Sequence, residues 1–109
     1  MSSGKGCPLP VSIEDFRKVF EGKSDAAVIV DVRTPAESDK GSFAKALRMP
    51  LTEIQARLAE IPEDKEIYLH CATGARAKMG WAYLKQHRKK VKYLKAKVVS
   101  RKGKMKVRP

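Results

Sequence analysis

The stretch Glu66-Ile-Tyr-Leu-His-Cys-Ala-Thr-Gly-Ala-Arg-Ala77 decides the fold that we expect for this chain. Residues 66–70 form a short, mostly apolar run, which is typical of a buried strand. Apolar residues then recur at helical spacing, and this pattern predicts a helix over residues 75–87. Cys71 is therefore expected on the turn between a strand and a helix.

The rest of the chain alternates between strand and helix patterns. Strands that alternate with capped helices indicate an α/β domain with a mostly parallel sheet. We predict a helix over residues 12–21, a central strand over 26–33, a loop with one helical turn over 36–46, a brief strand over 47–51, a helix with a capping box at Thr52 that ends before Pro62, and a strand over 88–99.

The chain has 109 residues, which is enough for one compact domain. We expect a flexible lead over residues 1–10, a domain over 11–99 and a basic tail over 100–109. No apolar run approaches the roughly 20 residues of a membrane span, and the N-terminus lacks the apolar region of a signal peptide. The expected location is cytoplasmic, or periplasmic if an export signal was removed.

The two cysteines, Cys7 and Cys71, are far apart and match no metal-ligand spacing. This pattern argues against a disulfide framework and against structural zinc. We expect neither a metal nor a cofactor, and we interpret Cys7 as an idle thiol.

The net charge of +12 is distributed unevenly along the chain. Residues 1–66 contain ten Lys/Arg and all twelve Asp/Glu, whereas residues 67–109 contain fourteen Lys/Arg and no acid. A field of one sign attracts anions, from small sulfur anions to nucleic acids and acidic proteins. Either the tail binds a polyanion weakly or its charges serve only to keep the protein solvated.

Cys71 is the candidate nucleophile, because ligands of parallel α/β sheets bind beyond the carboxyl ends of the strands. The first-turn amides of the following helix and the nearby Arg76 would stabilise a thiolate there. Gly74 can adopt a positive φ and let the backbone curl around the sulfur. The alternative is that Cys71 is a buried packing residue.

Two motifs, Asp31-Val-Arg-Thr-Pro-Ala-Glu37 and Cys71-Ala-Thr-Gly-Ala-Arg-Ala77, resemble those of the rhodanese family, and the likeness covers about residues 10–87. The resemblance implies a three-layer domain with a central, mostly parallel sheet. It also implies a sulfurtransferase in which Cys71 takes sulfur from thiosulfate or polysulfide. Cys71 would hold the sulfur as a persulfide and pass it to a thiol or a protein acceptor.

The resemblance assigns roles to further residues. The backbone amides of residues 72–77 would hold the persulfide, and Arg76 and the Thr73 hydroxyl would bind donor oxygens. An ion pair between Arg33 and Glu37 would order a loop. The expected substrate-binding residues are Ala72, Thr73, Gly74, Ala75, Arg76 and Ala77, and the expected loop-ordering residues are Asp31, Arg33 and Glu37.

Some features depart from this family or leave alternatives open. Residues 41–46 lack the usual His, Pro and second Gly. We also expect the usual C-terminal helix to be missing or rebuilt. Cysteine phosphatases share the architecture but have five residues between Cys and Arg, whereas four separate Cys71 from Arg76. A second function is a persulfide carrier that docks an acidic protein or RNA through its basic C-terminal half.

Overall fold

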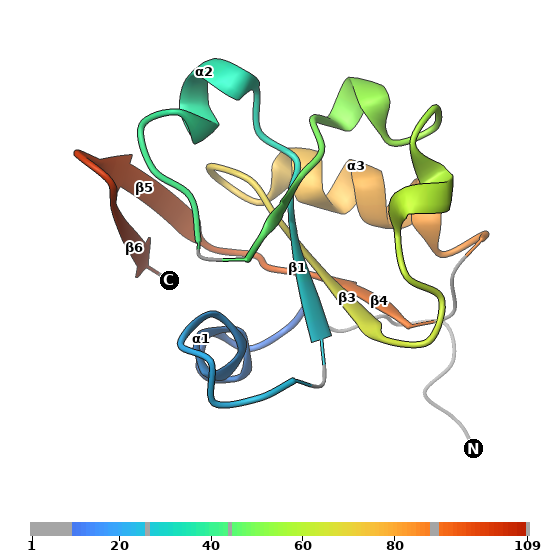
Figure 1. Ribbon diagram of the computed structural model, residues 1–109, viewed down its shortest axis with the longest axis horizontal. Helices are drawn as coiled ribbons and strands as arrows, with labels where there is room; N and C mark the ends of the chain where they lie inside the picture. The colour runs from blue at the N-terminus through green and yellow to red at the C-terminus, as the bar shows by residue number, and fades with distance from the viewer. Residues whose placement is uncertain (1–9, 26, 44, 88–89, 109) are drawn as a thin grey trace.

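The centre of the molecule is a four-stranded sheet in which all neighbouring strands are parallel (Figure 1). The computed structural model describes residues 10–25, 27–43, 45–87 and 90–108, so the predicted lead, with Cys7, lies outside the described residues apart from Pro10. In spatial order the strands are β2 (Leu47–Arg48), β1 (Ala27–Asp31), β3 (Glu66–His70) and β4 (Val91–Tyr93).

The two central strands place the loops that follow Asp31 and His70 at one edge of the sheet. β1 and β3 pair in register over their full length, from Ala27 opposite Glu66 to Asp31 opposite His70. Both strands are almost wholly buried, as their apolar sequences predict. Because parallel strands end at the same edge, the loop after Asp31 and the loop after His70 emerge side by side.

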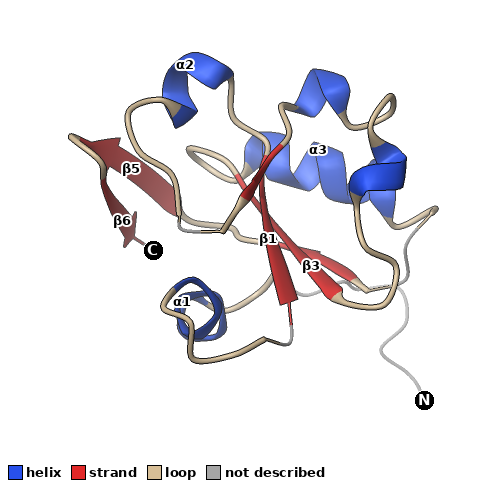
Figure 2. Ribbon diagram, in the orientation of Figure 1, coloured by secondary structure: helices blue, strands red, loops and turns tan. Residues whose placement is uncertain are grey.

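Helices cover both faces of the sheet, which gives three layers (Figure 2). α1 (Ile13–Phe20) begins at Ser12, whose side chain accepts a hydrogen bond from the Asp15 amide, and it buries Phe16 against one face. α3 (Ala75–Leu84) packs against β3 and β4 on the other face. The predicted α/β fold with a central parallel sheet is confirmed.

The helix predicted between Thr52 and Pro62 is wrong. The chain instead forms two 3-10 turns, η1 (Leu51–Glu53) and η2 (Leu58–Glu60), and neither has a side-chain cap. Arg57, between them, donates hydrogen bonds to Glu53, to Glu60 and to a backbone carbonyl. These side-chain bonds and the burial of Ile54 and Ile61, which directly follow the two turns, replace a regular helical ladder.

The C-terminal region also differs from the prediction. The single strand expected over residues 88–99 is divided into β4 and β5 (Lys97–Arg101), and β5 pairs antiparallel with β6 (Lys104–Arg108). β6 thus lies in the segment interpreted as a tail. Lys102 and Gly103 have φ of 51° and 82°, the positive values that a two-residue hairpin turn requires. Within the described residues no helix follows α3, so the C-terminal helix is replaced by this hairpin.

A short helical turn follows β1, as predicted. α2 (Pro35–Ser38) begins with a capping box, in which Thr34 and Glu37 exchange backbone and side-chain hydrogen bonds.

None of the helices in the described parts of the chain is long and apolar enough to cross a membrane.

Candidate active site

Cys71 follows the last residue of β3 and lies inside a curled loop. Its Sγ accepts hydrogen bonds from the Gly74 amide, with N and Sγ 2.9 Å apart, and from the Ala77 amide at 3.4 Å. Gly74 has a φ of 100°, so the predicted positive φ is confirmed. Two of the six backbone amides expected to surround the sulfur therefore donate to it.

Burial of Cys71 is nearly complete, with 1% of the residue exposed. The residue belongs to the core cluster on the α3 face, which fits the packing alternative. A thiol that only fills space needs no hydrogen-bond donors, whereas two main-chain N–H groups are aimed at this sulfur. The loop thus combines burial of the sulfur with two main-chain donors directed at it.

The connection between β4 and β5 covers the loop. A Cβ on Gly74 would lie 3.2 Å from both the Leu94 carbonyl oxygen and the Lys95 Cα. The Val98 amide donates a 2.8 Å hydrogen bond to the Ala72 carbonyl. The segment from Leu94 to Val98 thus packs directly on the loop that holds the sulfur.

Arg76 and Glu37 form a two-pronged ion pair at the rim of the loop. The two terminal nitrogens of Arg76 lie 2.7 and 2.9 Å from the two Glu37 carboxylate oxygens. The hydrogen bonds from Arg76 lower the pKa of Glu37 to about 2, despite partial burial, and those from Thr34 add to the shift. The prediction that Glu37 pairs with Arg33 is wrong. Its partner comes from the Cys71 loop.

Arg33 is instead buried against Asp31, with 2% of its surface exposed. Its Nε and one Nη donate to the two Asp31 oxygens at 2.9 and 2.8 Å, and the same Nη donates to the Gly41 carbonyl. Burial opposes ionisation of Asp31, but hydrogen bonds from Arg33 and Ser38 outweigh it and lower its pKa to about 2. The pair fixes the loop between β1 and β2.

The other Arg33 Nη donates to Ser100 Oγ at 3.0 Å, and Ser100 Oγ in turn donates to the Glu37 carbonyl at 3.4 Å. Our sequence reasoning missed Ser100. It lies 67 residues from Arg33, in a segment with no recognised motif. No local signal in the sequence could have identified it.

His70 precedes Cys71 but points to the opposite face of the sheet. Its ring is fully buried between Phe16 and Phe43, and its Nε2 lies 3.9 Å from an Asp31 oxygen. Burial lowers the pKa of His70 to about 4, although the Asp31 carboxylate opposes the shift. A neutral imidazole on the far face cannot take a proton from Cys71 directly.

The remaining loop residues differ in exposure. Thr73 and Ala75 are exposed, whereas Ala77 is fully buried at the start of the α3 core face. The Thr73 side chain is exposed at the rim of the loop, and no hydrogen bond to its hydroxyl occurs among the described residues. The site as a whole offers one free thiol, two amides aimed at its sulfur and a cation at its edge.

Comparison with known proteins places this geometry in context. A family model described as "Rhodanese-like domain" matches residues 12–99. A protein of Allochromatium vinosum named "Sulfurtransferase" is 40% identical over 63 residues, which are 58% of this chain and 59% of that protein. The Bacillus subtilis protein named "Putative sulfur carrier protein YrkF" is 33% identical over 78% of this chain and 46% of its own length.

The chain thus spans 59% and 46% of the lengths of these two relatives. Among solved structures, the human single-domain sulfurtransferase TSTD1 superposes with a TM-score of 0.70 and 23% identity. The superposition covers 83% of this chain and 90% of that one, and at this identity it describes the fold alone.

Proposed function

The chain belongs to the family of rhodanese-like domains, and from this premise we propose that it is a sulfurtransferase whose Cys71 carries sulfane sulfur as a persulfide. The observation that carries the proposal is the pair of amides, of Gly74 and Ala77, directed at the Cys71 sulfur. Main-chain donors fixed around a sulfur atom stabilise negative charge on it without further reorganisation. The thiolate carries that charge on the Cys71 sulfur, whereas the persulfide anion carries it mainly on the outer sulfur. The two amides therefore act most directly on the Cys71 thiolate, both when it attacks and when it leaves.

In the first step the Cys71 thiolate attacks the outer sulfur of thiosulfate. A new S–S bond forms to Cys71, the S–S bond of thiosulfate breaks, and sulfite leaves with the electron pair of the broken bond. No proton is transferred and no oxidant is needed. The same displacement on polysulfide releases a shorter polysulfide.

In the second step an acceptor thiolate attacks the outer sulfur of the persulfide. The acceptor gains the sulfur, the persulfide S–S bond breaks, and Cys71 is released as a thiolate stabilised again by its amides. We assign binding of the donor oxygens to the Thr73 hydroxyl and to the charge of Arg76. Because Glu37 already occupies both terminal nitrogens of Arg76, that cation also fixes the loop to α2.

A persulfide carrier is the second candidate function. The exposed fraction of Cys71 is 1%, and the segment from Leu94 to Val98 packs on its loop. Small free thiols would reach such a sulfur slowly, whereas a partner protein that displaces this segment would reach it directly. A carrier therefore loads sulfur but releases it to one docked partner.

Intact-protein mass spectrometry tests both candidates. After incubation with thiosulfate or polysulfide, we expect a mass gain of one sulfur that a reductant reverses and that Cys71→Ser lacks. Thiocyanate formation from cyanide then reports turnover. Loading with turnover supports the enzyme, and loading without turnover supports the carrier. Absence of loading from both donors, in a protein that is folded, would falsify the proposal.

A further inference from the structure

The β5–β6 hairpin carries positive charge on one face. Side chains of alternate residues in paired strands share a face, and the register sets Lys97 opposite Arg108 and Arg101 opposite Lys104. These four residues are exposed, as is Lys106 between them. We call this surface the basic ribbon. It consists of Lys97, Arg101, Lys104, Lys106 and Arg108, with Val99 at its centre and Lys102 at the turn.

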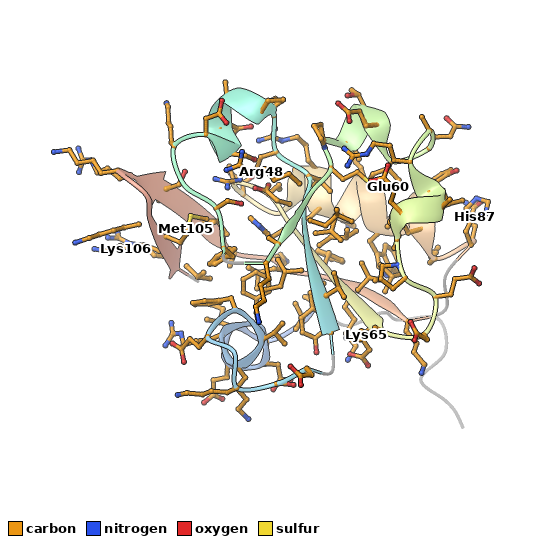
Figure 3. All side chains as sticks on the ribbon, viewed as in Figure 1. Arg48, Glu60, Lys65, His87, Met105 and Lys106 are labelled. Atoms are coloured by element: carbon orange, nitrogen blue, oxygen red, sulfur yellow. The ribbon has the colours of Figure 1, made fainter. Side chains whose placement is uncertain are left out.

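The opposite face of the hairpin fixes the direction in which the basic ribbon points. Val98 is buried, and Met105 and Val107 pack against the cluster that contains Phe16. The Gly103 amide also donates a 2.9 Å hydrogen bond to the Lys40 carbonyl. In Figure 3 Lys106 projects away from the domain at the outer edge of the molecule. The cations are thus held outward by the packing beneath them.

The basic ribbon contains repulsion that nothing in the described residues relieves. None of its cations forms an ion pair within the described ranges, although six salt bridges between charged side chains occur elsewhere in them. Like charges directly opposite each other on paired strands destabilise the pair, and both Lys97–Arg108 and Arg101–Lys104 are of this kind. A bound polyanion would remove this repulsion.

We propose that the basic ribbon binds the phosphate backbone of double-stranded RNA. Four of its six cations are lysines, which are depleted at protein interfaces but make phosphate contacts readily. Tyr93, the aromatic residue of this C-terminal region, is buried, so the surface offers no ring on which unpaired bases could stack. These features favour a phosphate ligand in a duplex over an acidic protein or a single strand.

The spacing of the cations favours RNA over DNA. Facing side chains on paired strands are about 5 Å apart, so the ribbon presents two close rows of positive charge. An A-form RNA duplex has a narrow major groove bordered by two phosphate rows, whereas that of B-form DNA is about 12 Å wide. The two rows can therefore bridge the phosphate rows that border an A-form groove, whereas a two-stranded ribbon enters the wider B-form groove instead.

RNA bound in this way would lie beside the Cys71 loop, because β5 is joined to that loop by the hydrogen bond between Val98 and Ala72. The binding itself requires no sulfur chemistry. It is therefore independent of the proposed sulfurtransferase activity, and the two proposals can fail separately.

Fluorescence anisotropy with a labelled RNA duplex of about 20 base pairs tests the proposal. We expect saturable binding at about 50 mM salt that weakens by roughly 1,000-fold at about 200 mM, as five or six phosphate contacts predict. The double variant Lys104→Ala/Lys106→Ala should reduce the slope of log K against log salt by about 2 and the affinity by at least about tenfold.

The matched control is Arg17→Ala/Lys18→Ala, which removes two exposed cations from α1. It should change the affinity by less than about twofold. If the β6 variant does not fold, as judged by circular dichroism, Lys97→Gln/Arg101→Gln makes the same test on β5. Cys71→Ser should bind RNA like the unaltered protein.

Four results would overturn the proposal. The first is the absence of saturable RNA binding at low salt, and the second is an equal loss of RNA affinity in the ribbon and α1 variants. The third is binding of a DNA duplex of the same sequence as tightly as RNA, and the fourth is binding of polyglutamate of matched charge as tightly as RNA. The last result would instead assign the surface to an acidic protein.

Discussion

Replacement of Gly74 by alanine tests whether the curled loop controls the chemistry of Cys71. At a φ of 100° any Cβ is strained, and here it would also lie 3.2 Å from backbone atoms of Leu94 and Lys95. The strain amounts to about 1–2 kcal/mol, and displacement of packed backbone adds about 1–2 kcal/mol. We therefore expect Gly74→Ala to lower the free energy of unfolding by about 3 kcal/mol.

Gly22→Ala is the matched control for this substitution. Gly22 also has a positive φ, 81°, but a Cβ there meets no atom within 4 Å. Only the conformational strain remains, so the expected loss is about 1 kcal/mol. Urea unfolding of the two variants separates the cost of the contact from the cost of the backbone angle.

The same pair of variants connects geometry to function. Movement of residue 74 withdraws its amide from the Cys71 sulfur, and loss of one such donor slows a reaction by roughly 100-fold. We expect persulfide loading to slow by about this factor in Gly74→Ala and to be unchanged in Gly22→Ala, when measured by mass spectrometry on folded protein. Equal destabilisation of the two variants, or normal loading by Gly74→Ala, would refute the reasoning.

Three further predictions concern the polar network around the loop. The pKa of His70 is about 4 in the folded protein and about 6.5 in the unfolded protein, so the unfolded state binds more protons between these pH values. The free energy of unfolding should therefore fall by about 3 kcal/mol as the pH drops from 6.5 to 4. His70→Phe should abolish this loss in urea unfolding at pH 7 and 4.5, and a loss that persists in the variant would count against the prediction. Glu37→Gln should destabilise the fold by no more than about 1 kcal/mol but slow persulfide loading several-fold, because it releases the Cys71 loop from α2. The control Glu53→Gln weakens an exposed pair with Arg57 and should leave loading unchanged. Similar loading rates for both variants would show that Glu37 does not position the loop. Ser100→Ala removes a hydrogen-bond acceptor of the buried Arg33 and should lower the free energy of unfolding by about 1–2 kcal/mol. Amide hydrogen exchange in β5 and β6 should become faster, and unchanged exchange there would mean that Ser100 does not anchor the hairpin.

The C-terminal hairpin illustrates why some elements escaped prediction. Basic residues alternate with apolar ones over residues 104–108, but the charge suggested a solvated tail. The hairpin forms because Val98, Met105 and Val107 pack in the apolar cluster that contains Phe16 and because Lys102 and Gly103 adopt positive φ. The reverse applies to residues 51–61, where a sequence that fits a helix forms separate turns held by Arg57.

The sequence alone determined the features that depend on near neighbours. The apolar runs of β1 and β3, the strand-to-helix turn at Cys71 and the positive φ of Gly74 all follow from residue type and local spacing. Tertiary structure decided which polar side chains meet, because Arg76 and Glu37 are 39 residues apart and Arg33 and Ser100 are 67 apart. Local preferences cannot specify such pairs, since the register of the sheet and the path of the chain bring them within hydrogen-bonding distance.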